Sequence, residues 1–153
     1  MILPRYRVAP SRIPGAGQGL FLDEPVSRAA VIIAPDNVHT LWPEEKLRAC
    51  PADSIEVSSS VRWFERWFSL TPEWSDECFV NHSFEPSGLW HLGFIFAAAD
   101  LVAGTEITAD YRFLLGSGED AGFACGHTGR PIVGLPWRDN LQQSAQALLR
   151  LLE

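Results

Sequence analysis

The chain has 153 residues, of which 46% are hydrophobic and 20% charged, and its formal net charge is −7. This composition is typical of one globular domain and excludes a disordered chain. The acidic charge argues against direct binding of nucleic acid, because affinity for phosphates comes from Lys and Arg, and it favours a basic protein partner. No apolar run reaches the ~20 residues of a membrane span, and the first residues lack the features of a signal peptide, so we expect a cytoplasmic protein.

Eleven prolines and twelve glycines divide the chain into short segments. Most of these segments are rich in β-branched and aromatic residues, which favours strands over helices. The expected strands cover residues 5–9, 19–22, 30–34, 54–57, 89–97 and 105–108. The sequence therefore predicts a mostly β fold with a few helices.

A first helix is expected over residues 58–70, as part of a helical insert at about 43–70. Its polar residues recur at the spacing i, i+3, i+4 and i+7, which would place them on one stripe of a helix. These residues are Arg62, Glu65, Arg66 and Ser69. The remaining side chains of the segment are mostly apolar, so we expect the helix to be buried over most of its surface.

A second helix is expected over residues 141–152, capped by Asp139 or Asn140. One stripe of this helix is apolar and consists of Leu141, Ala145, Leu148, Leu149 and Leu152. The stripe would pack either against the domain or against a second copy of the chain in a homodimer. We therefore expect one domain at residues 1–137, with a glycine-rich functional loop at 116–134, followed by a C-terminal helix at 138–153.

Three short motifs stand out from this background. Gly-Ala-Gly-Gln-Gly-Leu-Phe at residues 15–21 is a turn whose glycines let backbone groups approach a ligand closely. Phe-Val-Asn-His-Ser-Phe-Glu-Pro at residues 79–86 places polar side chains among apolar ones, where they need partners. Gly-Thr-Glu-Ile-Thr-Ala-Asp-Tyr at residues 104–111 leads a strand into one of only two tyrosines. Taken singly, each motif is explained by an ordinary turn or by packing.

In this order, the three motifs resemble those of the SET-domain family of S-adenosylmethionine-dependent lysine methyltransferases, over roughly residues 5–125. The resemblance implies a β-clip fold of small curled sheets, in which the Asn-His-Ser strand threads beneath a C-terminal loop as a pseudoknot. It implies methyl transfer from S-adenosylmethionine to the side-chain amine of a lysine in a protein substrate, which would be basic. The alternative is a non-catalytic interaction module of the same fold that binds the donor without turnover.

The resemblance also assigns the residues that would bind the donor. The backbone groups of Ala16, Gly17 and Gln18 would hold its methionine part. The Asn81 side chain and the His82 backbone would hold the rest. The ring of His82 would either contribute to this site or act only as a structural hydrogen-bonding group.

Tyr111 would be the catalytic residue, placed where the methyl group of the donor meets the lysine amine. Its hydroxyl would orient the amine or act as a base, and we favour orientation because the transfer needs mainly alignment and a neutral amine. Phe79 and Trp90 would line the lysine channel together with Tyr111. Trp90 stands where many members of the family have a tyrosine, so the degree of methylation is not predicted.

Many relatives that act on histones carry a zinc-binding cysteine cluster after the last motif. Cys125 and His127 supply only one thiol and one nearby imidazole at this place, which is too few for a tetrahedral zinc site, so we expect no metal. An aromatic residue in this region of the family stacks on the adenine of the donor. Phe123 or Trp137 would take that role here.

A hydrolase site made of Ser83, His82 and Asp110 is a competing interpretation of the same residues. It fails on geometry, because Ser83 and His82 are adjacent on an expected strand and would point to opposite faces.

Overall fold

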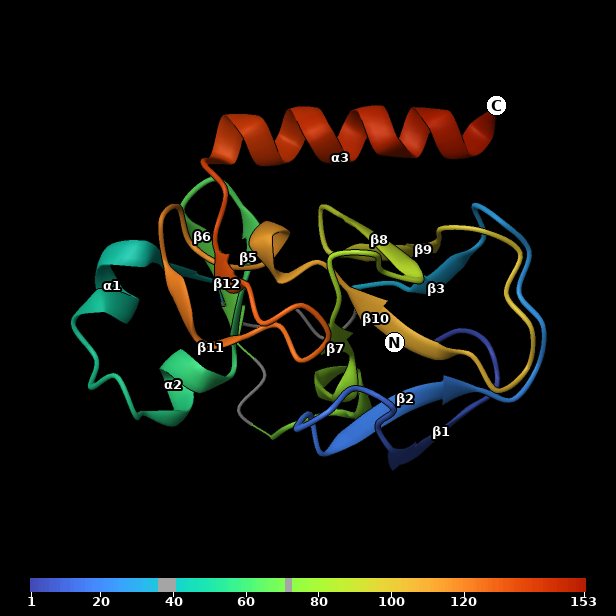
Figure 1. The fold of residues 1–153 in the computed structure, drawn as a ribbon. Helices are drawn as coiled ribbons and strands as arrows, with labels where there is room; N and C mark the ends of the chain where they lie inside the picture. The colour runs from blue at the N-terminus through green and yellow to red at the C-terminus, as the bar shows by residue number, and fades with distance from the viewer. Residues whose placement is uncertain (36–40, 71–72) are drawn as a thin grey trace.

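The computed structural model describes residues 1–35, 41–70 and 73–153, and short strands dominate it. Within these residues there are twelve strands, which account for 34% of the structure, together with three α-helices and two 3-10 helices. The strands form four small sheets, and one helix lies at the C-terminal end (Figure 1). The prediction of a mostly β fold with a few helices is confirmed. No helix in the described part of the chain combines the length and the apolar character needed to cross a membrane.

The first sheet contains segments of all three motifs. Its strands are β1 (Tyr6–Pro10), β2 (Gln18–Leu22), β10 (Glu106–Ala109) and β7 (Asn81–His82), in the order β1-β2-β10-β7. β1, β2 and β10 are antiparallel neighbours, whereas β7 runs parallel to β10. The parallel pairing sets Asn81 opposite Thr108 and His82 opposite Ala109, so the second and third motifs lie side by side.

The hydrophobic core surrounds the middle strands of this sheet. Leu20, Leu22 and Ile107 are completely buried, and all four residues of β10 are buried. A strand that is covered on both faces favours a continuous apolar run, which Gly-Leu-Phe-Leu supplies in β2. In β10 the apolar Ile107 and Ala109 alternate with Glu106 and Thr108, whose buried side chains are hydrogen-bonded. The buried cluster consists of Leu20, Leu22, Ile32, Ile33, Val80, Ile95, Ala97, Leu101, Ile107 and Ala109.

Three smaller sheets complete the β structure. One contains β3 (Val31–Ile33), β9 (Phe94–Ala97) and β8 (Gly88–His91), in that order. A second contains β4 (Leu41–Pro43), β6 (Trp67–Leu70) and β5 (Ser60–Phe64), in that order. The third pairs β11 (Asp120–Ala124) with β12 (Pro131–Val133). The strands expected at residues 5–9, 19–22, 30–34 and 105–108 are confirmed with small shifts of their ends. The strand expected at 89–97 is a hairpin, because Leu92 and Gly93 adopt positive φ angles and reverse the chain.

The helix expected over residues 58–70 is wrong, since this segment forms the hairpin of β5 and β6. The expected polar stripe included Arg62, but Arg62 is only 1% exposed. Its backbone N–H donates to the carbonyl of Leu114 (2.8 Å), and its guanidinium donates to the carbonyl of Leu135 (2.9 Å). A buried arginine looks like a solvent-facing residue in a one-dimensional pattern, and this produced the helical periodicity.

Two further expectations are corrected around this hairpin. The strand expected at residues 54–57 is the short helix α2 (Ile55–Ser58), and the Ser54 side chain caps it by accepting the N–H of Val57 (3.3 Å). The other short helix is α1 (Glu44–Arg48). The loop expected at residues 116–134 contains β11 and β12, which pair as an antiparallel hairpin.

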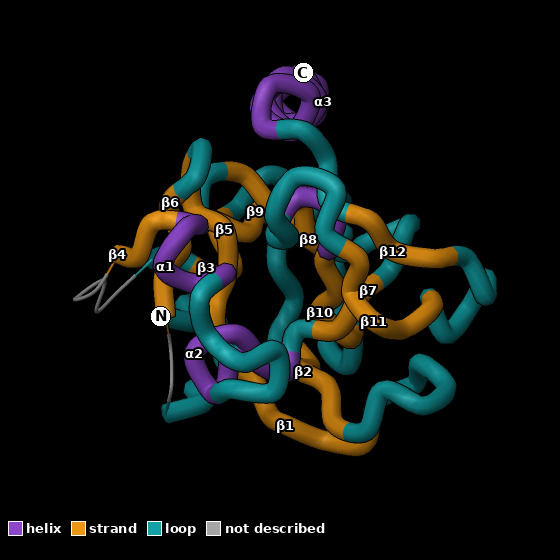
Figure 2. The backbone as a smooth tube through the Cα atoms, turned by 90° about the vertical axis from the view of Figure 1, so that its left-hand side faces the viewer, coloured by secondary structure: helices purple, strands orange, loops and turns teal. Residues whose placement is uncertain are grey.

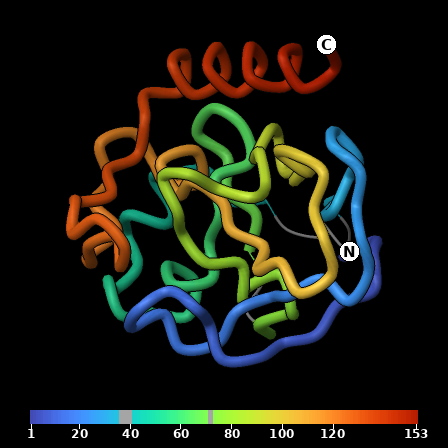
Figure 3. The backbone as a smooth tube through the Cα atoms, turned by 45° about the vertical axis from the view of Figure 1, so that its right-hand side comes forward, coloured from blue at the N-terminus to red at the C-terminus, as the bar shows by residue number. Residues whose placement is uncertain are grey.

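The C-terminal helix α3 (Trp137–Leu152) is confirmed, although it begins four residues earlier than expected. Its N-cap is Pro136, so the prediction of a cap at Asp139 or Asn140 is wrong, because both residues lie inside the helix. α3 lies across the sheets as a separate layer and packs against β8 and the 3-10 helix η2 (Tyr111–Phe113) (Figures 1 and 2). β1 and β2 lie at the opposite side of the molecule (Figure 3).

Replacing Glu65 with glycine tests the hairpin at residues 60–70. Glu65 has a φ of 45° in the turn between β5 and β6, a conformation that costs a residue with a Cβ roughly 1–2 kcal/mol. We expect Glu65→Gly to raise the free energy of unfolding by about 0.5–1 kcal/mol in urea denaturation, because the relief of the positive φ exceeds the extra conformational entropy that glycine loses on folding. Glu65→Ala, the control, should give no such gain. A helix would instead lose about 1 kcal/mol with glycine, so a decrease would contradict the hairpin.

Candidate functional site

The glycine-rich motif forms a closed turn between β1 and β2. The backbone N–H of Ser11 donates to the carbonyl of Gly17 (2.9 Å), and that of Ala16 donates to the carbonyl of Ile13 (3.2 Å). Gly15 and Gly17 have φ angles of 78° and 75°, in the region that favours glycine. No other atom lies within 4 Å of the position that a Cβ would take at either glycine, so this backbone is open on one side.

A buried carboxylate joins this turn to the second motif. Glu106, on β10, is 9% exposed and accepts hydrogen bonds from the Ser11 hydroxyl (2.5 Å) and the Arg12 backbone N–H (2.8 Å). It also accepts a longer one from the side-chain amide of Asn81 (3.3 Å), which donates to the carbonyl of Gln18 as well (2.7 Å). Glu106 therefore fixes the position of the turn relative to β7.

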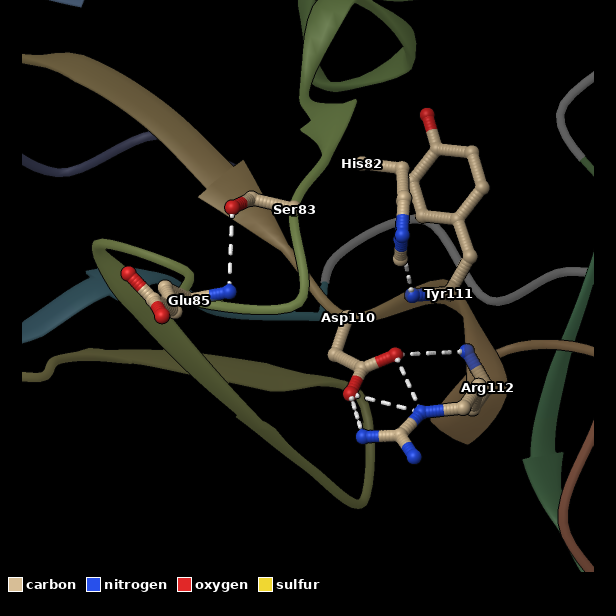
Figure 4. Close-up of polar contacts among 6 residues, drawn as sticks. All are labelled: His82, Ser83, Glu85, Asp110, Tyr111 and Arg112. Carbon is tan, nitrogen blue, oxygen red and sulfur yellow. Dashed lines mark hydrogen bonds and ion pairs between the residues drawn. The ribbon is translucent and has the colours of Figure 1, made fainter. Parts of the chain in front are cut away.

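The His82 ring joins the second motif to the third. Its Nδ1 atom accepts the backbone N–H of Tyr111 (3.1 Å), just beyond the end of the parallel pairing (Figure 4). Burial lowers the pKa of His82, so its imidazole is neutral near pH 7 and carries its proton on Nε2. Nε2 has no hydrogen-bond partner among the described residues, and the ring meets Phe84 edge to face at 4.6 Å. This geometry favours a structural role for the imidazole.

Tyr111 begins η2, and its side chain lies across the end of β7. Its hydroxyl donates to the carbonyl of Val80 (2.6 Å). Burial, with a smaller contribution from Cys78, raises the pKa of Tyr111 to about 12. The hydroxyl is therefore protonated at neutral pH, and its lone pairs are the part of the group that an incoming N–H would use.

The same close-up rules out a hydrolase triad (Figure 4). The Ser83 hydroxyl accepts the backbone N–H of Glu85 (3.1 Å), while the Asp110 carboxylate binds the guanidinium and backbone N–H of Arg112. The Nδ1 atom of His82 is occupied by a backbone N–H. None of these three side chains hydrogen-bonds to another, so no nucleophile–base–acid relay exists among them.

A cavity of about 390 Å³ lies where the motifs meet. Its walls come from the glycine-rich turn, from β7 with Tyr111, and from the end of β11 with the residues that follow it. The lining residues are Ile13, Pro14, Gly15, Ala16, Asn81, His82, Tyr111, Phe123, Ala124, Cys125 and Gly126. A Cβ at Gly126 would lie 2.6 Å from the carbonyl oxygen of Pro14, so only glycine permits the β11 end to approach the turn this closely.

Two side chains from the β11 wall have distinct properties. The Phe123 ring is 54% exposed and meets the Tyr111 ring edge to face, with centroids 6.3 Å apart. Cys125 is buried, which disfavours its thiolate, but hydrogen bonds from Thr128, His127 and Phe84 outweigh burial and lower the pKa of the thiol. Of these two side chains, Phe123 is the exposed one, so its ring is the aromatic surface that this wall presents to the cavity.

The structure brings together five of the residues that the sequence placed in a donor site. Ala16, Asn81, His82, Tyr111 and Phe123 all line the one cavity, although they come from segments up to about a hundred positions apart. Gly17 belongs to the same turn and Gln18 begins β2, and neither lines the cavity.

Three other predicted residues lie elsewhere. Phe79 ends the 3-10 helix η1 (Asp76–Phe79), and Trp90 packs against the hydrophobic core from β8. Neither lines the cavity. Trp137 lies at the start of α3, with the guanidinium of Arg62 5.9 Å from its ring centre, so of the two expected adenine-stacking residues only Phe123 reaches the cavity.

Sequence reasoning missed the role of Glu106 and the position of Cys125. The signal for Glu106 was available, because an acidic residue on a core strand requires hydrogen-bond donors. Cys125 gave no such signal, since a single buried cysteine usually only packs.

Comparison with models of protein families finds no match to this chain, and a search of curated proteins finds no match either. In the part of the chain that the structure describes, no three side chains of His, Cys, Asp or Glu are grouped so that they could hold a metal ion.

Replacing Glu106 with glutamine should destabilise the protein. One carboxylate oxygen becomes an NH₂ group, which faces donors and cannot accept from them. Loss of a buried hydrogen bond to a charged group costs about 1.5–3 kcal/mol, so we expect the free energy of unfolding to fall by about 2 kcal/mol in urea denaturation. Glu85→Gln, at an exposed carboxylate, is the matched control and should change little. Equal stability of both variants would show that Glu106 does not hold the turn.

Proposed function

We propose that this chain is an S-adenosylmethionine-dependent protein-lysine methyltransferase with a SET-type fold, and that the cavity described above binds the methyl donor. The observation that carries the proposal is the convergence of all three motifs on one cavity. Ala16 comes from the first motif, Asn81 and His82 from the second, and Tyr111 from the third. Motifs that were only turns or packing segments would have no reason to share a cavity.

The fold supports the same proposal. β7, which carries the Asn-His-Ser motif, runs parallel to β10 and continues into a segment whose Ser83 N–H donates to the carbonyl of Ala109 (3.0 Å). Small separate sheets and a C-terminal segment packed near β7 are what the SET resemblance implies. The acidic charge of the chain suits a basic, lysine-bearing protein as substrate.

The residues of the cavity fit the donor that the family uses. Its volume of about 390 Å³ falls within the range of about 300–1,000 Å³ that is usual for small-molecule sites. The open backbone at Gly15 and Ala16 would hold the amino-acid part, and the side-chain oxygen of Asn81 would accept from a polar group of the ligand. The exposed ring of Phe123 would stack on a purine base, with Tyr111 beside it. When bound, S-adenosylmethionine supplies a methyl group on a positively charged sulfur.

Tyr111 would act by orientation and not as a base. Its pKa of about 12 keeps the hydroxyl protonated, and the proton is directed to the Val80 carbonyl. The oxygen lone pairs would then accept an N–H from the substrate amine and fix its direction. A lysine amine has a pKa of about 10.4, so reaching the neutral form at pH 7 costs roughly 4.6 kcal/mol, which burial beside a positive sulfur reduces.

One observation favours a second function, a non-catalytic module that binds the donor without turnover. Phe79 and Trp90, expected beside Tyr111 in a lysine channel, do not line the cavity. A substrate lysine would then have to approach Tyr111 past other residues. Donor binding without methyl transfer to any lysine-rich protein would support this second function.

Replacing Tyr111 with phenylalanine tests the catalytic role. Without the hydroxyl the substrate amine is not aligned, and misplacement of this kind costs about 100-fold in rate. We expect transfer of labelled methyl from S-adenosylmethionine to a panel of lysine-rich proteins to fall by about that factor, with donor affinity unchanged in calorimetry. Tyr6→Phe is the matched control, because Tyr6 bonds to Asp76 outside the cavity. Full activity of Tyr111→Phe would refute the role of the hydroxyl.

Replacing Phe123 with alanine tests the donor site independently of catalysis. A base stacked on an aromatic ring contributes about 1–3 kcal/mol, so we expect the Kd for S-adenosylmethionine to rise by about tenfold or more in calorimetry. Trp137→Leu is the control, since Trp137 is the other aromatic candidate and lies outside the cavity. Circular dichroism should show both variants folded. An effect at Trp137 and none at Phe123 would place the base elsewhere, and no binding by the wild-type chain would refute the donor site.

A further inference from the structure

A second cavity, of about 350 Å³, lies between the two short helices and the segment that leads into β11. It shares no lining residue with the first cavity, which Tyr111 lines. Figure 1 shows α1, α2 and β11 at the same end of the molecule. The volume falls within the range of about 300–1,000 Å³ that is usual for small-molecule sites, so the second cavity can hold a compact ligand.

One part of its wall is apolar. This part consists of Leu47 on α1, Val57 on α2 and Phe68 on β6. Leu47 and Phe68 are buried, so their neighbours hold this surface in place. Burial of apolar groups drives most binding to such surfaces, so a ligand of this cavity needs an apolar body.

Most of the polar side chains in the wall already have partners within the chain. The carboxylate of Glu44 binds the guanidinium groups of Arg48 (2.5 Å) and Arg66 (3.3 Å). The hydroxyl of Ser60 donates to a backbone carbonyl of α2 (2.9 Å). These groups are engaged in holding α1 and α2 in position.

Glu119 differs from them, because only one of its carboxylate oxygens is engaged. Oε2 accepts the backbone N–H of Gly116 (2.6 Å), and a Cβ at Gly116 would lie 2.8 Å from that oxygen and 3.5 Å from the Phe68 ring. Within the described residues, no hydrogen bond or ion pair reaches Oε1. The cavity therefore has an anchored carboxylate beside an apolar surface, with one acceptor unused. A cationic N–H donor is the group that such an acceptor binds best.

The segment that carries Glu119 is tied to the β11–β12 hairpin. The N–H of Gly118 donates to the carbonyl of Gly134 (2.9 Å), and the N–H of Gly134 donates to the carbonyl of Glu119 (2.8 Å). The next residue, Asp120, begins β11 and pairs with Val133. The other end of β11 lines the first cavity, so this hairpin connects the walls of both cavities.

We propose that the second cavity binds a small molecule with a cationic amine on an apolar body, and that the bound molecule stabilises the β11–β12 hairpin. The amine donates to Oε1 of Glu119, and the apolar body covers Leu47, Val57 and Phe68. Such a ligand contacts both helices and the residues before β11, so it opposes opening of the hairpin. It thereby supports the C-terminal wall of the first cavity, whatever ligand that cavity holds.

Three probes with the same six-carbon chain test the chemistry of the site: hexylamine, hexan-1-ol and hexanoate. In an NMR titration of the isotope-labelled full chain, we expect hexylamine to shift the backbone amides of residues 117–119 saturably, with a Kd of about 1 mM for so small a ligand. Hexan-1-ol should bind about fivefold more weakly, because an ion pair near the surface contributes modestly, and hexanoate should not bind. Absence of saturable shifts with hexylamine, or equal binding of hexanoate, would refute the proposal.

Two variants locate the amine. Glu119→Gln should weaken hexylamine about fivefold and leave hexan-1-ol unchanged, because it removes the charge of the acceptor. Glu85→Gln, the same change at an exposed carboxylate outside the cavity, is the matched control. Ala52→Phe fills the cavity from an exposed position in its wall and should abolish binding of both probes, with the rest of the NMR spectrum unchanged. Wild-type affinity for hexylamine in Glu119→Gln or Ala52→Phe would show that the amine binds elsewhere.

Hydrogen exchange tests the effect on the hairpin. At ten times its Kd, hexylamine should slow exchange of the Gly134 N–H by up to about tenfold, because opening of this hydrogen bond would release the ligand. The N–H of Leu3, bonded to Ile32 near the N-terminus, is the internal control and should not change. Bound hexylamine that leaves exchange at Gly134 unaltered would refute the stabilisation of the hairpin.

Discussion

The Glu106 carboxylate is the contact on which the arrangement of the three motifs depends. A carboxylate only accepts hydrogen bonds, so it can hold donors from the turn and from β7 at the same time. The position of Glu106 also explains why residue 19 of the first motif is a glycine. A Cβ there would lie 2.3 Å from an oxygen of Glu106 and 3.3 Å from the Asn81 amide. This glycine therefore makes room for a protein side chain, whereas Gly15 and Gly17 provide turn conformations.

The parallel pairing of β7 and β10 has a second consequence for the site. After Ala109 the ladder ends, and the N–H of Tyr111 would have no backbone partner. The His82 ring accepts it instead, which orders the start of η2 and directs the Tyr111 side chain to the Val80 carbonyl. The groups that the fold needs for its own hydrogen bonds are thus the groups that surround the cavity. The same hydrogen bonds therefore stabilise the fold and set the shape of the cavity.

The sequence predicted the β strands well where an apolar run or a short alternating segment is bounded by glycine, as in β2 and β10. It failed at residues 58–70, because periodicity treats every charged residue as exposed and Arg62 is buried against backbone carbonyls. In the site, the ordered motifs predicted which residues converge. They could not predict that Trp90 packs on the core, since its position depends on how the β8–β9 hairpin turns at Leu92 and Gly93. The motifs also could not show which of Phe123 and Trp137 reaches the cavity, because that depends on the path of the chain after η2.

The cavity exists only because two distant segments meet. The turn after β1 forms one wall, and the end of β11 forms the opposite wall, held against it by the close approach of Gly126 to Pro14. The β11–β12 hairpin pairs mainly with itself and many of its residues are exposed, so the interface with the turn is a weak part of the fold. A ligand that contacts both walls stabilises the closed arrangement by mass action, in proportion to the logarithm of its concentration over its Kd. Binding of such a ligand would therefore be coupled to the ordering of the C-terminal wall of the cavity.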